Sequence, residues 1–287
     1  MSTDPQGYVA GLFGCAGKRV IVTGAAEGLG KAMAAGFARA GARVLVADLN
    51  GDGLAETARE LSGISHDIAS CRTDITSADD VEALFAHASD ILGGVDVLVN
   101  NAGALISSGA PETYSFRDWQ ATLAVNLTGS YLCAQAAGRL MIAAGHGGSI
   151  INISSIGGIT SLGGGAMAYD VSKSGVIQLT RELAVEWARY GIRVNSIAPC
   201  HFRTRGWQQA STEPAGRAAI ARVISGIPMG RMGEAEEIVG AALFLASSGA
   251  AMVNGIVLPV DGGNLALNAT HGGVLSPSAA SIAEETM

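Results

Sequence analysis

The sequence predicts a single α/β domain, in which helices cover both faces of a seven-stranded, doubly wound parallel sheet. Short runs rich in Val and Ile alternate with longer helical patterns along most of the chain. Several of these runs are apolar almost throughout, which is typical of parallel strands buried on both faces. Repeated alternation of strand and helix implies right-handed crossovers within one sheet. The 40 glycines stand at the ends of apolar runs and exclude an all-helical protein.

Seven runs have the length and composition of strands, and six segments between them have helical periodicity. The predicted strands are Arg19–Thr23, Arg43–Ala47, Ala69–Thr73, Val95–Asn100, Ser149–Ile153, Arg193–Ile197 and Ile256–Val260. The predicted helices are Leu29–Ala40, Leu54–Ser62, Ser77–Leu92, Arg117–Ala144, Ala168–Tyr190 and Ala235–Ala246. No internal repeat or interdomain linker interrupts this order, so we expect one domain spanning residues 1–263.

Two segments fall outside the alternation. Residues 202–232 hold Gly, Pro, Arg and a short helical pattern, and they follow the carboxyl end of the sixth strand. Ligands of open α/β sheets bind at that end, so we expect this insertion to be a substrate lid. Residues 264–287 are small, polar and rich in Gly, Ser and Ala. They are expected to form a C-terminal tail that is either mobile or packed on a partner subunit.

Composition restricts the class of protein further. A hydrophobic content of 48% with 15% charged residues allows a large core, and the net charge of −7 argues against a nucleic-acid or anionic membrane partner. The four cysteines form no CxxC pair, and no His stands at metal-ligand spacing, so we expect reduced thiols and no metal site. No signal peptide and no 18-residue apolar stretch is evident. We therefore expect a cytoplasmic protein without a membrane partner.

The first predicted strand runs directly into a glycine-rich loop and then a helix. This loop, Thr23–Gly30, contains Gly24, Gly28 and Gly30. Glycines at such a place let the backbone turn tightly and approach a pyrophosphate, which binds the free N–H groups of the helix N-terminus. Because the loop follows the first strand of a βαβ unit, it predicts a dinucleotide site rather than a turn that needs Gly for geometry alone.

The choice of dinucleotide depends on Asp48, at the end of the second strand and 18 residues after Gly30. A carboxylate there accepts hydrogen bonds from the adenosine ribose and repels a 2′-phosphate. We expect no Arg or Lys beside it, and Glu27 adds a second acidic group, so the sequence favours NAD(H) over NADP(H). The alternative is that Asp48 only caps the next helix. Asp74 after the third strand is expected either to reach the adenine amino group or to cap a helix.

Several motifs together resemble those of the short-chain dehydrogenase/reductase family, from about Leu12 to Asn264. They occur in the family's order and on the expected elements. The motifs are Thr23-Gly24-x3-Gly28-x-Gly30, Asn100-Asn101-Ala102-Gly103, Asn126, Ser155, Tyr169-x3-Lys173 and Pro199 to Thr204. The resemblance implies a Rossmann fold and hydride transfer between a nicotinamide and an alcohol or carbonyl carbon, with no metal.

The family's catalytic roles carry over to four positions. Tyr169 would be the general acid/base at the substrate oxygen, and Lys173, one helical turn away, would lower the pKa of that phenol together with the positive nicotinamide. Ser155 would polarise the substrate oxygen, although Ser154 beside it has the same chemistry and the Ser155–Tyr169 spacing is one residue longer than usual. Asn126 would distort its helix and hold a water that links Lys173 to solvent.

The family's cofactor contacts carry over to the strand ends, the glycine-rich loop and the start of the lid. Asn100 to Gly103 would stabilise the central sheet and let Gly103 approach the cofactor, and Phe202 and Thr204 would contact the nicotinamide carboxamide. Cys200 departs from the family, which has Gly there, and catalysis by its thiol is not expected. The full set of expected cofactor contacts is Gly24, Glu27, Gly28, Leu29, Gly30, Asp48, Leu49, Asp74, Ile75, Asn101, Ala102, Gly103, Tyr169, Lys173, Pro199, Phe202 and Thr204.

The substrate is less well specified. Residues 179–204 look most like the gluconate 5-dehydrogenase and polyol dehydrogenase branch, so we expect a sugar acid, polyol or similar hydroxy compound. Ser155, Tyr169, Cys200, His201 and Arg205 are the expected substrate contacts. Two interpretations stay open.

In the first, His201, Arg203 and Arg205 bind an anion, unless they are solvated or paired with lid acids such as Glu213. In the second, Trp207, Met229 and Met232 line an apolar pocket.

Two other functions fit the same fold. One is a 3-oxoacyl carrier-protein reductase, against which the acidic ribose site argues, and the other is a catalytically silent NAD-binding scaffold. The resemblance also implies a homotetramer, with the helices after the fourth and fifth strands packing across a two-fold axis.

Overall fold

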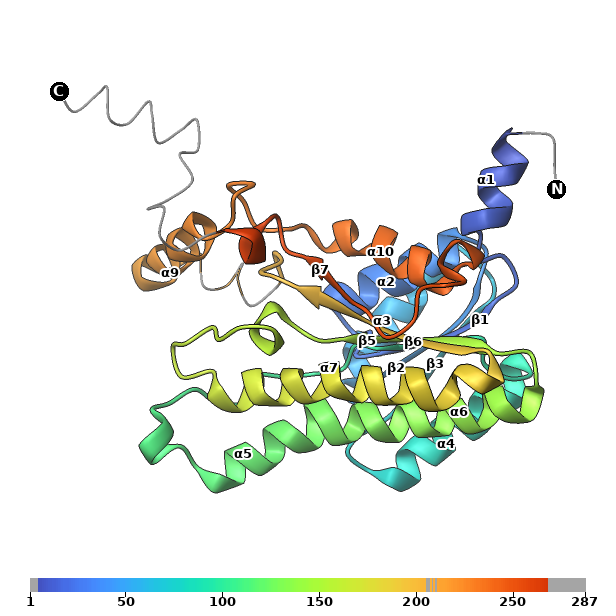
Figure 1. Cartoon of the computed structure of the whole chain (residues 1–287), viewed down its shortest axis with the longest axis horizontal. Helices are drawn as coiled ribbons and strands as arrows, with labels where there is room; N and C mark the ends of the chain where they lie inside the picture. Colours follow the sequence, from blue (N-terminus) through green and yellow to red (C-terminus); the bar gives the residue numbers. More distant parts are fainter. Residues whose placement is uncertain (1–4, 205–206, 208, 210, 268–287) are drawn as a thin grey trace.

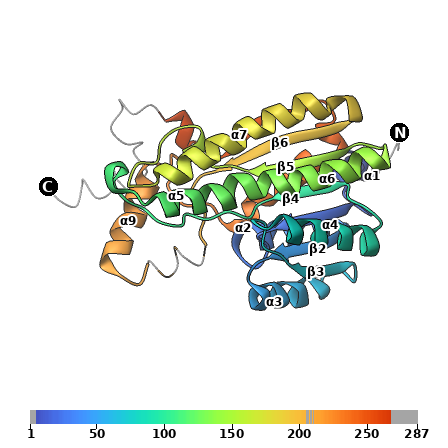
Figure 2. The ribbon, with the colours of Figure 1, turned by 90° about the horizontal axis from the view of Figure 1, so that it is seen from below.

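The structure is a computed structural model that describes residues 5–204, 207, 209 and 211–267. These residues form one seven-stranded sheet in the order β3-β2-β1-β4-β5-β6-β7, and every strand pair is parallel. Helices lie on both faces of the sheet (Figure 1 and Figure 2). The predicted doubly wound Rossmann fold is therefore confirmed.

The strands agree with the predicted runs to within two residues at either end. They are β1 (Arg19–Thr23), β2 (Arg43–Asp48), β3 (Ile68–Arg72), β4 (Val97–Asn100), β5 (Gly148–Ile153), β6 (Ile192–Pro199) and β7 (Val257–Val260). The helices are α1 (Pro5–Phe13), α2 (Gly28–Arg39), α3 (Gly51–Ser62), α4 (Ala78–Leu92), α5 (Phe116–Leu123), α6 (Ser130–Ala144), α7 (Met167–Trp187), α9 (Pro214–Ser225) and α10 (Val239–Ala246).

Two apolar cores hold the helices to the sheet. Alternate strand residues such as Val20 and Val22 pack with α2, α3 and α10 on one face, where Phe37 is fully buried. Ile21 and Leu98 point to the opposite face and pack with α4, α6 and the end of α7. Continuous apolar strands are thus explained by burial on both sides. None of the described helices is long and apolar enough to cross a membrane.

The single long helix predicted over Arg117–Ala144 is wrong in one respect. The structure has α5, then a π-helical segment at Ala124–Gly129, then α6. Asn126 lies in the π-helical segment, and the Ser130 hydroxyl donates to its carbonyl at 2.8 Å. Tertiary contacts of Asn126, described below, hold this segment in place, and no periodicity in the sequence reports them. Helix α1 was not expected either, whereas α9 is the short helix of the 202–232 segment.

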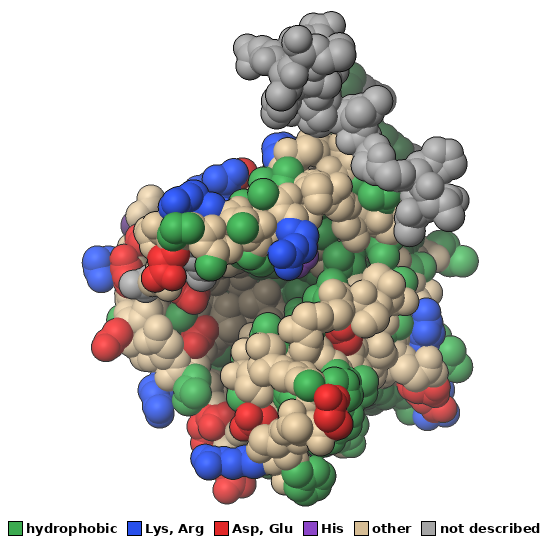
Figure 3. Space-filling view, turned by 90° about the vertical axis from the view of Figure 1, so that its left-hand side faces the viewer, with side chains coloured by type: hydrophobic (Ala, Val, Ile, Leu, Met, Phe, Trp, Pro, Cys, Tyr) green, Lys and Arg blue, Asp and Glu red, His purple; other side chains and the backbone are tan. Residues whose placement is uncertain are grey.

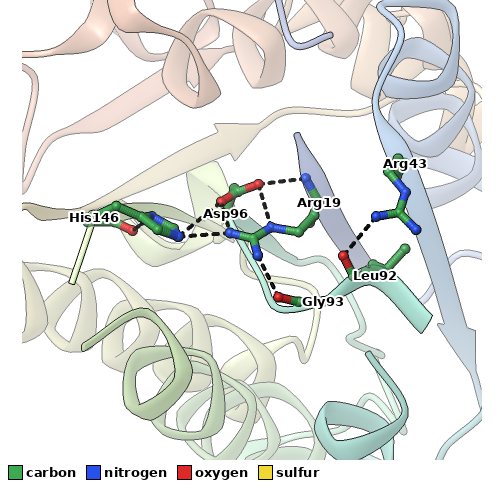
Figure 4. A network of polar contacts seen from close by, with 7 residues as sticks. Arg19, Arg43, Leu92, Gly93, Asp96 and His146 are labelled. Atoms are coloured by element: carbon green, nitrogen blue, oxygen red, sulfur yellow. Dashed lines mark hydrogen bonds and ion pairs between the residues drawn. The ribbon is translucent and has the colours of Figure 1, made fainter. Parts of the chain in front are cut away.

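An ion-pair network fastens the amino ends of the strands (Figure 4). Arg19 on β1 donates to Asp96 through Nε at 2.9 Å and Nη2 at 2.5 Å, and its Nη1 donates to the carbonyl of Gly93. His146, before β5, lies 2.8 Å from the same guanidinium. Although burial alone would raise it, the hydrogen bonds from Arg19 hold the pKa of Asp96 below its ordinary value. The network joins three chain segments at the edge opposite the predicted site.

The carboxyl ends of the strands all meet at the other edge, where α9 and the start of the lid segment lie (Figure 1). Figure 3 looks onto this edge and shows that the molecular surface is hollowed there. Of the expected tail, residues 264–267 are described and residues 268–287 lie outside the described residues. Whether the 202–232 segment acts as a lid stays a prediction.

Candidate active site

A groove of about 780 Å³ runs along the carboxyl edge of the sheet. The glycine-rich loop, the ends of β2 to β6, helix α7 and the beginning of the lid segment all contribute to its walls. The expected site residues that line it are Gly24, Glu27, Gly28, Leu29, Asp48, Leu49, Asp74, Ile75, Asn101, Ala102, Gly103, Ser155, Tyr169, Lys173, Pro199, Cys200, His201, Phe202 and Thr204. Gly30 and Asn126 stand behind its wall, and Arg205 lies outside the described residues.

The glycine-rich loop is packed so tightly that two of its glycines have no room for a side chain. A Cβ on Gly30 would lie 2.1 Å from the carbonyl oxygen of Gly24, and a Cβ on Gly24, where φ is +65°, would lie 2.7 Å from Cα of Ala102. Asn101 braces the loop by donating its amide to the carbonyls of Thr23 and Gly24 at 3.1 and 2.8 Å. The loop therefore has one fixed shape.

The amino end of α2 faces the groove without a side-chain cap, because Glu27 at the N-cap position makes no capping hydrogen bond. First-turn N–H groups of a helix have no partner within the helix and attract anions. Gly28, with φ of +60°, keeps this end open, since only the methyl of Thr204 would approach its Cβ, at 3.7 Å. An uncapped helix end beside a glycine cradle fits the pyrophosphate of a dinucleotide.

Asp48 accepts two backbone hydrogen bonds, from Ala26 in the loop and from Asn50, each at 2.9 Å. The cap of α3 is Asn50, whose side chain accepts from Gly53, so the helix-capping alternative for Asp48 is wrong. The expectation that no cation lies beside Asp48 is also wrong. Strand pairing places Arg72 directly opposite Asp48, with its Cδ near Gly51. Pairing between strands separated by a helix is not visible in the linear sequence.

Asp74 is used within its own turn. Its Oδ1 accepts from the backbone and the hydroxyl of Thr76, at 2.9 and 2.7 Å. The cap of α4 is Ser77, which accepts from Asp80. Asp74 therefore stabilises the turn before α4 and also lines the groove. Because Ser77 caps α4, the alternative that Asp74 caps this helix is wrong.

Ser155 and Tyr169 meet at the centre of the groove. A hydrogen bond joins their side chains, and the Ser155 oxygen also accepts from the backbone of Gly157 at 3.0 Å. The hydroxyl of Ser154 points into the sheet instead, where it donates to the carbonyl of Ile197 and accepts from Ser196 at 2.7 Å. The structure thus separates two serines that the sequence left equivalent, and the longer Ser155–Tyr169 spacing does not prevent their contact.

Lys173 lies beneath the tyrosine and is buried, with 3% of its surface exposed. Its Nζ donates to the carbonyl of Ile153 at 2.8 Å and lies 5.7 Å from the centre of the Tyr169 ring. Burial lowers the pKa of this ammonium to about 8. Burial also raises the pKa of Tyr169, against the hydrogen bond from Ser155. The expected lowering of this pKa by Lys173 together with a bound nicotinamide stays a prediction.

Asn126 acts as a buried clamp between two parts of the site. Its side chain accepts from the backbone N–H of Ala104 at 2.7 Å, donates to the carbonyl of Ala104 at 3.0 Å and donates to the Ser172 hydroxyl at 2.9 Å. Ser172 in turn donates to the carbonyl of Tyr169 at 2.6 Å. Sequence reasoning missed Ser172. The only signal in the sequence was a hydroxyl-bearing residue directly before Lys173.

The start of the lid segment closes one side of the groove. Phe202 is buried and forms an isolated parallel bridge with Gly233. The Cys200 thiol is half-buried, and burial raises its pKa, so it is a neutral thiol rather than a nucleophile. Arg203 is paired with Glu234 at 3.0 Å and not with Glu213.

The apolar alternative for the substrate pocket is met in part. Of its three expected residues, Trp207 lines the groove. Met232 is buried elsewhere, and Met229 is 71% exposed beside a separate pocket. Among the described residues, no group of three His, Cys, Asp or Glu side chains could hold a metal ion.

Sequence comparison finds enzymes similar to nearly the whole chain. A family profile described as enoyl-(acyl carrier protein) reductase matches residues 24–264. A D-threitol dehydrogenase from Mycolicibacterium smegmatis is 40% identical over 247 residues, which are 86% of this chain and 92% of the relative. A 2-dehydro-3-deoxy-D-gluconate 5-dehydrogenase from Escherichia coli is 37% identical over 260 residues, 90% of this chain and 99% of the relative.

Solved structures are similar over the same range. A candidate short-chain alcohol dehydrogenase from Sinorhizobium meliloti superposes with a TM-score of 0.83 at 37% identity, covering 90% of this chain and 100% of the other. A candidate 2-deoxy-D-gluconate 3-dehydrogenase from Agrobacterium tumefaciens, with NADP bound, superposes with a TM-score of 0.80 at 36% identity, covering 89% and 99%. The shared fold thus carries a nicotinamide dinucleotide in at least one similar protein.

Proposed function

This chain belongs to the short-chain dehydrogenase/reductase family, and from that premise we propose that it is an NAD(H)-dependent enzyme interconverting a secondary alcohol and a ketone. Its relatives include sugar and polyol dehydrogenases, which supports an oxidoreductase acting on alcohols. One observation carries the finer proposal. Tyr169 and Ser155 are hydrogen-bonded to each other, above a buried Lys173, in the groove that also receives the uncapped end of α2.

The dinucleotide would be held by residues from both halves of the groove. The first turn of α2 would bind the pyrophosphate, and Asp48 would bind the adenosine ribose while Lys173 would bind the nicotinamide ribose. A bound nicotinamide would take up or supply the hydride exchanged with the substrate carbon. The proton exchanged with the substrate oxygen must then be transferred by a side chain of this protein.

Tyr169 would take the hydroxyl proton of the alcohol when the alcohol is oxidised and return it when the ketone is reduced. Ser155 would donate a hydrogen bond to the same substrate oxygen and stabilise the charge that develops on it. Lys173 would favour the phenolate of Tyr169 through its charge, and Asn126 would hold the water that connects Lys173 with solvent. Asn126 and Ser172 would keep α7 in register with the loop after β4, so that these groups converge.

The preference for NAD(H) rests on Asp48. Its carboxylate would accept from the ribose hydroxyls and would repel a 2′-phosphate. Arg72, which stands opposite Asp48, would instead favour a 2′-phosphate, and a similar protein binds NADP. We propose NAD(H) as the favoured cofactor because Asp48 lines the groove and Arg72 does not.

The substrate would be a sugar acid, a polyol or another small hydroxy compound. Oxidation of polyols, sugar acids and 3-hydroxyacyl thioesters with NAD⁺ and with NADP⁺ tests the proposal. NAD⁺-dependent turnover of a polyol or sugar acid is the expected result. Preferential use of the thioesters with NADPH would favour the acyl reductase alternative. Intact NAD⁺ binding without any turnover would favour a silent scaffold.

The family resemblance supports a homotetramer in the cytoplasm. Helices α5, α6 and α7 lie side by side on one face of the molecule (Figure 2), where Tyr131, Val171 and Val185 are exposed. All four cysteines are unpaired, as is usual in a reducing compartment. We propose that a second copy of the chain covers this helical face.

A further inference from the structure

The half of the groove beyond Tyr169 is where a substrate would enter, if the proposed function holds. Its described walls come from the loop after β4, the loop after β5 and the start of the lid segment. They present the side chains of Leu105, Ile106, Ile156, Leu162, His201 and Trp207. Four of these six side chains are aliphatic, so the pocket favours an organic substrate with few charges.

No free cation faces this pocket from the described residues. Lys173 is the one cationic side chain in the described lining, and its ammonium is buried against the carbonyl of Ile153. Arg203, although it is close in sequence, is absent from the lining and is paired with Glu234. A carboxylate brought into such a pocket loses its water without gaining an opposite charge, which is strongly unfavourable.

His201 supplies hydrogen-bonding capacity without charge. Its imidazole lies edge-on to Trp207, with the ring centres 5.5 Å apart and the planes at 87°. Burial lowers its pKa, so the ring is neutral at pH 7 and offers one donor and one acceptor nitrogen. Neither nitrogen has a hydrogen-bond partner among the described residues around it, whereas the hydroxyl of Ser155 is already bonded to Gly157 and Tyr169.

We infer that the pocket selects an uncharged polyol over a sugar acid, and that His201 is the specificity-determining residue that binds a second hydroxyl of the substrate. A hydroxyl can donate to one imidazole nitrogen or accept from the other, whereas a carboxylate can only accept. Trp207 fixes the plane of the ring, so the second hydroxyl must lie at a set distance from the carbon that reacts at Tyr169.

Two matched substrate pairs test this inference on the wild-type chain with NAD⁺. Threitol and threonate share four carbons and differ in charge, and 2,3-butanediol and 2-butanol differ in one hydroxyl. We expect kcat/KM to be about 10-fold or more higher for threitol than for threonate, and for the diol than for the mono-alcohol. Equal or better use of threonate, or equal use of diol and mono-alcohol, overturns the inference.

Variants at His201 then identify the residue responsible. His201→Phe keeps a planar ring without nitrogens, and it should lower the ratio of kcat/KM for the diol to kcat/KM for 2-butanol by about 10-fold. His201→Gln, which keeps a donor and an acceptor, should restore part of the loss. His66→Phe, the same change at an exposed position outside the groove, is the matched control.

A uniform loss for both alcohols in His201→Phe would overturn the assignment of His201. The failure of the proposed function looks different. In that case the wild-type chain turns over no alcohol with either dinucleotide, and both the proposed function and the inference fall. If the wild-type chain turns over both members of each substrate pair equally well, only the inference is contradicted and the proposed function stands.

Discussion

Asp48 has an observed structural role and a proposed role in cofactor recognition. Both of its carboxylate oxygens accept backbone hydrogen bonds, from Ala26 and Asn50, which fixes the glycine-rich loop over β2. The same charge would disfavour a 2′-phosphate, and Arg72 on β3 would favour one. We therefore expect the cofactor preference to depend on these two opposed charges on neighbouring strands.

Asp48→Asn should shift the preference toward NADP⁺. The amide oxygen can still accept one of the two backbone hydrogen bonds, so the loop should persist, while the repulsive charge is gone. We expect the ratio of kcat/KM for NADP⁺ to that for NAD⁺ to rise about 10-fold, as measured by steady-state kinetics with one alcohol. Arg72→Ala should move the ratio the other way. An unchanged ratio in both variants would show that neither charge discriminates.

Lys173 illustrates the conflict between stability and function. Its folded-state pKa of about 8 lies below the ordinary 10.5, so the fold is destabilised while the ammonium stays charged. Below pH 8 this cost is complete, and it is relieved as the pH rises from about 8 to 10.5, because the folded state releases its proton first. Wild-type stability should therefore gain over that window.

Lys173→Met should be more stable than wild type by about 1–2 kcal/mol at pH 7, after the lost hydrogen bond to Ile153 is counted. Denaturant unfolding at several pH values measures this. The advantage should shrink toward pH 10.5, whereas activity should be lost at every pH. Lys31→Met, at the exposed Lys31–Glu60 pair, serves as the surface control. A variant less stable than wild type at pH 7 would contradict the account.

Helix α2 packs closely against α10 on one face of the sheet. Gly36 allows this contact, since a Cβ there would lie 2.2 Å from Cγ1 of Val239. Gly36→Ala should therefore reduce the free energy of unfolding by about 1–3 kcal/mol. Val239→Ala should restore stability when it is combined with Gly36→Ala, which a double-mutant cycle measures. Additive losses would show that the two residues do not meet.

The elements that the sequence predicted well are those whose residues are buried by the sheet itself. The strands β1, β2 and β4 are mostly apolar because both of their faces are covered, so periodicity and composition are sufficient to find them. The segment around Asn126 could not be predicted, since its π-helical turn depends on contacts with Ala104 and Ser172 that are distant in sequence. Helix α1 has no such periodic signal: its exposed face includes Tyr8 and Val9.

The site residues also divide into those predictable from the sequence and those that depend on contacts between distant segments. Residues at strand ends, such as Asp48 and Ser155, were predictable because parallel strands bring their carboxyl ends to one edge. The residues that stand beside these site residues were not predictable. Arg72 stands opposite Asp48 only through strand pairing, and the different contacts of Ser154 and Ser155 depend on which one faces β6.

At the scale of the whole molecule, the two edges of the sheet have different tasks. The amino edge is fastened by the network of Arg19, Asp96 and His146, whereas the carboxyl edge is open and carries the groove (Figure 4 and Figure 3).

The exposed face of α5, α6 and α7 bears on the assembly of the whole molecule. If a second copy covers it, light scattering should give a mass about four times the 28.9 kDa of one chain. Replacing Val185, which is 77% exposed, by Glu should weaken the assembly, whereas the same change at Met252, which is 97% exposed and outside these helices, serves as the comparison. A monomer at micromolar concentration would contradict the proposed tetramer.

The central claim is that Tyr169 transfers the proton, and Tyr169→Phe tests it most directly because the ring is kept and only the hydroxyl is lost. The measurement is kcat/KM with NAD⁺ on an alcohol that the wild-type enzyme oxidises, beside NAD⁺ affinity, with Tyr8→Phe as the control at an exposed tyrosine on α1. We predict a loss of about 10²- to 10⁴-fold in kcat/KM with NAD⁺ affinity nearly unchanged. Wild-type activity in Tyr169→Phe would contradict the claim.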